Sequence, residues 1–250
     1  MSTPVSLTLF CLPYSGASAM FYSPWRRKLP EWLNVRPLEL PGRGMRMDEP
    51  LQIDIVQLAN HLADEISAEL DKPYALFGHS LGGLLAFELA HALRERGLPA
   101  PLALFASATA GPVRRDVSEY VAAKTDAQLI DRLRTLKGTS ENVIANQELM
   151  QLMLPILRAD FLLCGSFTYG ERAPLEMPIH VFGGKQDSVR ADQLLDWQLD
   201  AASGFSLDMF DGHHFFLMQH ESAVLRCVRR YADEHLARWR NGAARQLATG

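Results

Sequence analysis

The chain has 250 residues, of which 48% are hydrophobic and 22% are charged, and its formal net charge is −4. This length is enough for one full hydrophobic core, so we expect a single domain over residues 1–250. The net negative charge gives no basic field that would hold the phosphates of a nucleic acid. The composition therefore predicts an ordinary globular protein without a nucleic-acid partner.

The amino-terminal segment lacks the basic leader of a secretory signal, and no run of about 18 apolar residues predicts a membrane span. Cys11, Cys164 and Cys227 are widely spaced among apolar neighbours, which is typical of buried reduced thiols. No Cys-x-x-Cys pair or histidine-rich cluster indicates a metal site. We therefore expect a cytoplasmic monomer that needs no metal, no other cofactor and no membrane.

Short apolar runs alternate with segments of helical periodicity along the chain. This alternation predicts the α/β class, with a mostly parallel sheet flanked by helices. In chain order, the predicted strands are Val5–Leu12, Val35–Leu40, Tyr74–Gly78, Leu102–Ser107, Ile179–Gly183 and Ser206–Phe210. Helical patterns lie at residues 54–70, 81–96, 190–202 and 219–239.

Residues 114–170 interrupt this rhythm, because they contain helical patterns and no good strand candidate. The predicted helices there are Asp126–Lys137 and Gln147–Leu163, and the second carries one apolar stripe at helical spacing. The stripe consists of Leu149, Leu152, Met153, Ile156 and Leu157. A connection this long between two core strands is uncommon. We expect residues 114–170 to be a helical lid insertion over an active site.

The segment Gly78–Gly83 reads Gly-His-Ser-Leu-Gly-Gly, which fits the pattern Gly-x-Ser-x-Gly. A predicted strand precedes it and a predicted helix follows it, as in the nucleophile elbow of the α/β-hydrolase fold. The sharp turn needs neighbours without bulky side chains and aims the serine hydroxyl at the mouth of the sheet. Ser80 is therefore the predicted nucleophile.

A serine hydroxyl needs a base to take its proton and a carboxylate to orient that base. On this fold the chain order is serine, then acid, then histidine. Asp187 follows the predicted strand Ile179–Gly183, at the edge of the sheet where ligand-handling residues collect. The segment after the last strand contains two candidate bases, His213 and His214, which spacing alone does not separate. The weaker candidates are His79, His180 and His220.

Several blocks together resemble the type II thioesterases, standalone hydrolases that serve nonribosomal peptide and polyketide synthases. They are Phe10–Pro13 with Ser15–Ala19, Leu40–Gly44, Gly78–Ser80, Phe182–Gly184 with Asp187, and Gly212–Phe216. The resemblance covers essentially the whole chain. In that family the histidine directly before the paired phenylalanines is the base, which favours His214.

The resemblance implies an α/β-hydrolase that removes stray acyl or aminoacyl groups from the phosphopantetheine arm of a carrier protein. The implied partners are acyl or peptidyl carrier domains of a synthase. A looser resemblance points to pyochelin-type siderophore pathways. Ser15-Gly16-Ala17 departs from the family's usual Ala-Gly-Gly, which leaves two candidates for the first oxyanion-hole donor: the amide of Ser15, which we favour, and that of Tyr14. The second donor is the amide of Leu81.

Three other functions compete with this interpretation: a carboxylesterase or lipase acting on oxygen esters, a synthase's own chain-releasing domain, and a non-catalytic binding module. The complete serine, acid and histidine set disfavours the binding module. Two basic features are interpreted as solvated: Arg43 in its turn, and the pair Arg114 and Arg115. Their alternatives are steering of the arm's phosphate by Arg43 and contact of the pair with an acidic carrier.

Overall fold

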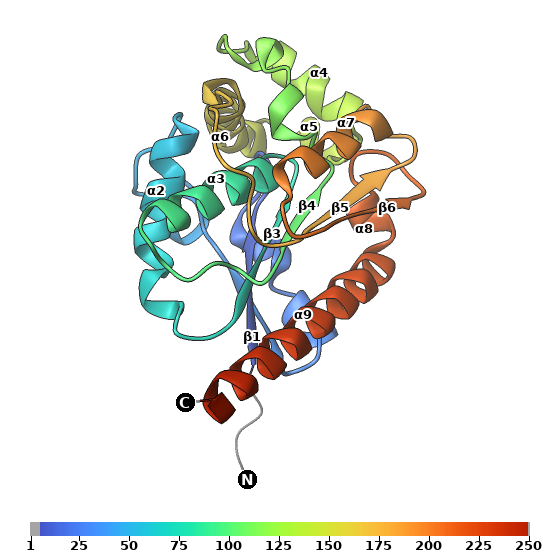
Figure 1. The fold of residues 1–250 in the computed structure, drawn as a ribbon. Coiled ribbons are helices and arrows are strands. Elements are labelled where there is room, and N and C mark those ends of the chain that lie inside the picture. The colour runs from blue at the N-terminus through green and yellow to red at the C-terminus, as the bar shows by residue number, and fades with distance from the viewer. Residues whose placement is uncertain (1–5, 250) are drawn as a thin grey trace.

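The computed structural model describes residues 6–249, which form one six-stranded parallel sheet flanked by helices (Figure 1). The strand order is β2-β1-β3-β4-β5-β6, and every neighbouring pair is parallel. The strands are β1 (Leu7–Leu12), β2 (Leu33–Pro37), β3 (Tyr74–His79), β4 (Leu104–Ser107), β5 (Ile179–Gly184) and β6 (Phe205–Phe210). The predicted fold class is confirmed.

Strand boundaries differ from the predicted ones mainly at β2. The prediction placed this strand at Val35–Leu40, whereas it begins at Leu33 and ends at Pro37. Pro37 has no N–H, so it cannot donate to the ladder, and the chain leaves the sheet soon after it. The predicted start of the first strand, Val5, lies outside the described residues.

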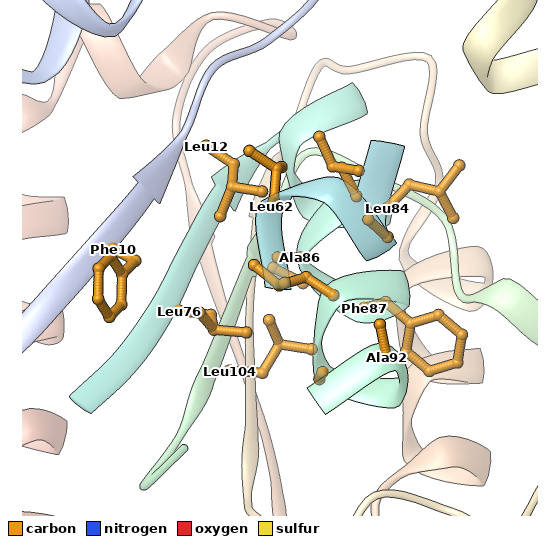
Figure 2. Packing of buried hydrophobic residues seen from close by; sticks show 14 of the residues in the cluster. Phe10, Leu12, Leu62, Leu76, Leu84, Ala86, Phe87, Ala92 and Leu104 are labelled. Carbon is orange, nitrogen blue, oxygen red and sulfur yellow. The ribbon is translucent and has the colours of Figure 1, made fainter. Parts of the chain in front are cut away.

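Alternating side chains of the sheet pack into two separate cores. On β1, Phe10 and Leu12 face α2 (Ile55–Ile66) and α3 (Leu81–Glu95), whereas Leu7, Leu9 and Cys11 face α9 (Glu221–Thr249). Figure 2 shows the first of these cores around β1, β3 and α3. Both faces are therefore covered, which is why strands such as β1 and β3 read as continuous apolar runs.

The remaining helical elements connect the strands at both ends of the sheet. They are η1 (Ala19–Tyr22), α1 (Trp25–Lys28), η2 (Gly44–Arg46), η3 (Ser67–Glu69), η4 (Pro112–Arg114), η5 (Ser118–Tyr120), α4 (Asp126–Leu136), α5 (Glu141–Ile144), α6 (Gln147–Ser166), α7 (Ala191–Leu195), η6 (Asp196–Asp200) and α8 (Phe216–Gln219). The last helix, α9, was predicted to end near residue 239 but continues to Thr249.

The strand order positions the functional loops. From β1 the chain crosses to β2 on one side, and β3 then pairs on the other side of β1. The loops after β1 and β3 therefore leave neighbouring strands at the same carboxyl edge, where Leu12 is the register partner of Gly78. Such a reversal of strand order opens a crevice that binds ligands in α/β sheets.

The insertion between β4 and β5 is helical, as expected, and its helices α4 and α5 lie at the top of Figure 1. The predicted apolar stripe on α6 is partly wrong, because Leu149 and Leu152 are exposed. Leu157 of the stripe is buried, together with Met150, Leu154 and Phe161. These side chains form a small core of their own with α4. That the insertion acts as a lid stays a prediction.

By length and composition alone, α6 is apolar enough to cross a membrane. In the structure, however, many of its side chains pack into the molecule. Phe161 belongs to the core shared with α4, and Leu163 and Cys164 belong to the core between the sheet and α3. Its Asp160 is fully buried and paired with an arginine. These contacts are those of a helix packed within a globular fold.

Candidate active site

Ser80 occupies a strained turn between β3 and α3. Its backbone has φ 54° and ψ −118°, an uncommon conformation for a residue with a side chain. The turn is tight because Gly78 and Gly82 allow backbone atoms to approach closely. A Cβ on Gly78 would overlap the carbonyl oxygen of Gly82, and one on Gly82 would overlap that of Leu12. The elbow therefore requires glycine at both positions.

We expect Gly82→Ala to lower the free energy of unfolding by about 3 kcal/mol, because the added methyl group meets rigid backbone rather than a movable side chain. The matched control is Gly242→Ala in α9, where an added Cβ meets no atom within 4 Å. Alanine there should be neutral or stabilising by up to about 1 kcal/mol. Denaturant unfolding curves measure both variants. Equal stabilities of the two would contradict the close approach at the elbow.

Ser80, His214 and Asp187 form one hydrogen-bonded chain across three loops. His214 Nε2 lies 3.0 Å from Ser80 Oγ, and His214 Nδ1 lies 3.0 Å from Asp187 Oδ2. His214 and Asp187 are nearly inaccessible, with side chains 9% and 1% exposed. Because a carboxylate only accepts, Nδ1 donates to Asp187 and Nε2 is left to accept the Ser80 proton. This geometry permits general-base activation of the serine.

The structure also separates the two adjacent histidines. His213 Nδ1 lies 3.0 Å from the carbonyl oxygen of Gln186, and its Nε2 faces Lys137, so the ring is turned away from Ser80. Among the weaker candidates, His180 contacts Ser206 and His235 instead. Only His214, of the histidines in the described part of the chain, bonds to Ser80.

His79 packs beside the base, with its ring centroid 5.3 Å from that of His214, but it is not among the residues that line the cavity beside Ser80. His79 is fully buried, and its Nδ1 lies 2.9 Å from Ser107 Oγ. Burial first, and the neighbouring His214 second, hold the pKa of His79 well below its ordinary value. His79 therefore stays neutral at pH 7, and His214 can take a proton without a second cation beside it.

The predicted oxyanion-hole amides lie at the crevice. Ser15 and Tyr14 line the same cavity as Ser80, and Leu81 begins α3. Within residues 6–249, no hydrogen bond engages the amides of Ser15, Tyr14 or Leu81. The positive end of the α3 dipole adds to the pull on a developing negative charge. Both first-loop candidates are thus open, and the assignment of Ser15 stays a prediction.

Arg43 is not solvated, which corrects the sequence interpretation. Its side chain is 3% exposed and makes a bidentate pair with the fully buried Asp160 of α6. The distances are 2.7 Å from Nη1 to Oδ2 and 2.6 Å from Nη2 to Oδ1. Asp160 was not among the predicted site residues. The available indication was a single carboxylate within the apolar run of α6, since such a group needs a buried partner.

A cavity of about 390 Å³ opens beside Ser80, a size typical of small-molecule sites. The insertion supplies much of its apolar wall through Leu133, Leu136, Met153, Leu157 and Phe161. Polar side chains also reach it, and Arg115 donates from Nη1 to Thr109 Oγ1 at 2.8 Å. Arg115 is therefore part of the cavity wall rather than solvated, whereas Arg114 is exposed and pairs with Asp196. The cavity can hold a small acyl group against the serine.

The family model of the thioesterase domain matches residues 7–231. The chain belongs to this family. The match spans all six strands and all three residues of the Ser80, His214 and Asp187 chain, and it confirms the resemblance that the sequence blocks carried.

Two relatives and one solved structure support the assignment. Gramicidin S biosynthesis protein GrsT of Aneurinibacillus migulanus is 37% identical over 220 residues, covering 88% of this chain and 86% of that protein. Linear gramicidin dehydrogenase LgrE of Brevibacillus parabrevis is 34% identical over 244 residues, covering 96% and 93%. The type II thioesterase BorB, from the borrelidin biosynthetic cluster, superposes with a TM-score of 0.84 at 36% identity, covering 92% and 94%.

Proposed function

We propose that this thioesterase hydrolyses stray acyl or aminoacyl thioesters on the phosphopantetheine arm of carrier proteins, and so restores stalled nonribosomal peptide or polyketide synthases. The hydrogen-bonded chain of Ser80, His214 and Asp187, which lies beside a cavity of about 390 Å³, carries the proposal. The relatives from gramicidin and borrelidin biosynthesis support the substrate class. The serine-based site supports hydrolysis rather than the dehydrogenation in one relative's name.

In the first half-reaction, Ser80 Oγ attacks the thioester carbonyl carbon while His214 Nε2 takes the hydroxyl proton. The carbonyl oxygen becomes an oxyanion, which the amides of Leu81 and Ser15 stabilise. Asp187 holds the imidazole in the required tautomer and stabilises the imidazolium that forms. The carbon–sulfur bond then breaks, the phosphopantetheine thiol leaves with the proton from His214, and the acyl group stays on Ser80.

In the second half-reaction, a water molecule attacks the acyl-enzyme carbonyl and gives a proton to His214. The oxyanion forms again in the same hole. When it collapses, Ser80 Oγ leaves and recovers that proton from His214. The products are a free carboxylic or amino acid and the enzyme in its starting state. No metal or other cofactor enters either half-reaction.

The carrier protein distinguishes this function from that of a carboxylesterase. We expect kcat/KM for an acetyl or aminoacyl group on a carrier to exceed that for the same group on free pantetheine by at least about tenfold, because carrier contacts add binding energy remote from the chemistry. Release from a loaded carrier is measured beside free thioester and 4-nitrophenyl acetate. Turnover of the oxygen ester alone would assign the site to an esterase instead.

A further inference from the structure

One carboxylate holds the loop that carries the predicted oxyanion donor. Asp160 Oδ2 accepts a hydrogen bond from the amide of Gly16 at 2.7 Å, and the same oxygen accepts from Arg43 Nη1. Asp160 comes from α6, so a residue of the insertion reaches into the loop after β1. Arg43 also approaches the carbonyl oxygen of Ala17 at 3.4 Å, which ties it to the same loop.

The Gly16 amide belongs to the central peptide of a turn over residues 14–17, and the orientation of this peptide decides the turn type. The Ala17 amide donates to the Tyr14 carbonyl oxygen at 2.9 Å, and Gly16 has φ 81°. A positive φ at the third residue is typical of a type II turn, which differs from type I by a flip of the central peptide. The N–H of that peptide is the Gly16 amide. By accepting it, Asp160 holds the peptide in one orientation, and the adjacent Ser15 amide is held with it.

The same contact ties the cavity wall to the reacting group. Leu157 lies one turn before Asp160 on α6 and lines the cavity, and its Cδ1 would lie 3.4 Å from a Cβ on Gly16. Phe161 follows Asp160 directly and also lines the cavity. The packing position of α6 and the position of the oxyanion donor therefore depend on one buried ion pair.

The geometry points to Asp160 and Arg43 as positioning residues for the oxyanion hole: the arginine orients the carboxylate, the carboxylate fixes the Gly16 amide, and the Ser15 amide is thereby aimed at the reacting carbonyl. This inference rests on the proposed role of Ser80. It assigns the pair a part in the chemical step, beyond a contribution to folding.

The test compares two double variants that each remove a bidentate arginine–carboxylate pair. Arg43→Met with Asp160→Leu removes the pair at the loop, since apolar groups of similar volume often replace a buried ion pair without unfolding. Arg172→Met with Glu88→Leu removes the matched pair between α3 and the segment before β5, where Glu88 is 3% exposed and the distances are 2.9 and 2.6 Å. The initial burst of nitrophenolate from 4-nitrophenyl acetate measures the rate at which Ser80 is acylated. The thermal unfolding midpoint of each variant is measured as well.

We expect the burst rate of the Arg43 and Asp160 double variant to fall about 100-fold, because a misplaced oxyanion donor raises the barrier of the acylation step. KM should change little, and the Arg172 and Glu88 variant should stay within about threefold of the wild type. Equal burst rates of the two double variants would overturn the inference.

If the first double variant does not fold, Asp160→Asn is compared with Glu88→Gln. Asp160→Asn should slow acylation at least about tenfold relative to Glu88→Gln, and equal rates would again overturn the inference. Because the nitrophenyl ester needs no carrier, failure of the carrier assay would sink the proposed function and leave this comparison intact.

Discussion

Ser80→Ala is expected to lower kcat for thioester hydrolysis by about 10⁴-fold or more, since it removes the hydroxyl that bonds to the base His214. The hydroxyl lies 3.0 Å from His214 Nε2 and opens on the cavity, so its removal takes away the nucleophile alone. Release of an acetyl group from a loaded carrier, under saturating conditions, measures the loss.

Ser107→Ala is the control for Ser80→Ala. Ser107 is fully buried at the end of β4, and its hydroxyl contacts His79 rather than the reacting groups. Activity of the control should stay within about tenfold of the wild type. Residual turnover in Ser80→Ala comparable to that of Ser107→Ala would remove Ser80 from the mechanism.

The two adjacent histidines give the second large effect. His214→Ala should lower kcat by about 10⁴-fold or more, because it removes the base that bonds to Ser80 and the group that Asp187 orients. His213→Ala should change kcat less than about threefold, because its ring contacts Gln186 and Lys137. Steady-state assays of both variants with one loaded carrier give the comparison.

His213→Ala is the control for His214→Ala, because it disturbs the same loop without removing the ring that bonds to Ser80. Loss of activity in both variants by similar factors would mean that the loop, and not His214 Nε2, carries the effect. Loss of activity in His213→Ala alone would mean that His213, and not His214, is the base. The distances predict neither result.

Local sequence patterns predicted the sheet and the elbow because both depend on near neighbours in the chain. Buried parallel strands such as β1 and β3 are continuous apolar runs, and Gly78–Gly82 carries its own turn chemistry. The order of serine, acid and histidine follows from the fold, so Asp187 was reached from its place after β5. The choice between His213 and His214 needed the family resemblance, because both lie in the loop after the last strand and differ by a single position.

The Arg43–Asp160 pair could not be predicted from local sequence patterns. Its partners are 117 residues apart, and one of them lies in the insertion, whose packing no periodicity specifies. Turn composition favoured a solvated arginine at Arg43, whereas tertiary contacts bury it. The exposed Leu149 and Leu152 have the same origin: helical spacing identifies an apolar face on α6 but not the angle at which the core meets it.

The proposed mechanism requires that an acyl group passes from a carrier thioester to Ser80. Rapid mixing of the enzyme with excess acetyl-loaded carrier, acid quenching and mass spectrometry of the peptide that contains Ser80 measure this transfer directly. We expect an acetyl group on Ser80 that forms before the free acid accumulates and that is absent in Ser80→Ala. Release of acetate at the wild-type rate with no acetyl group on Ser80 at any time would contradict it.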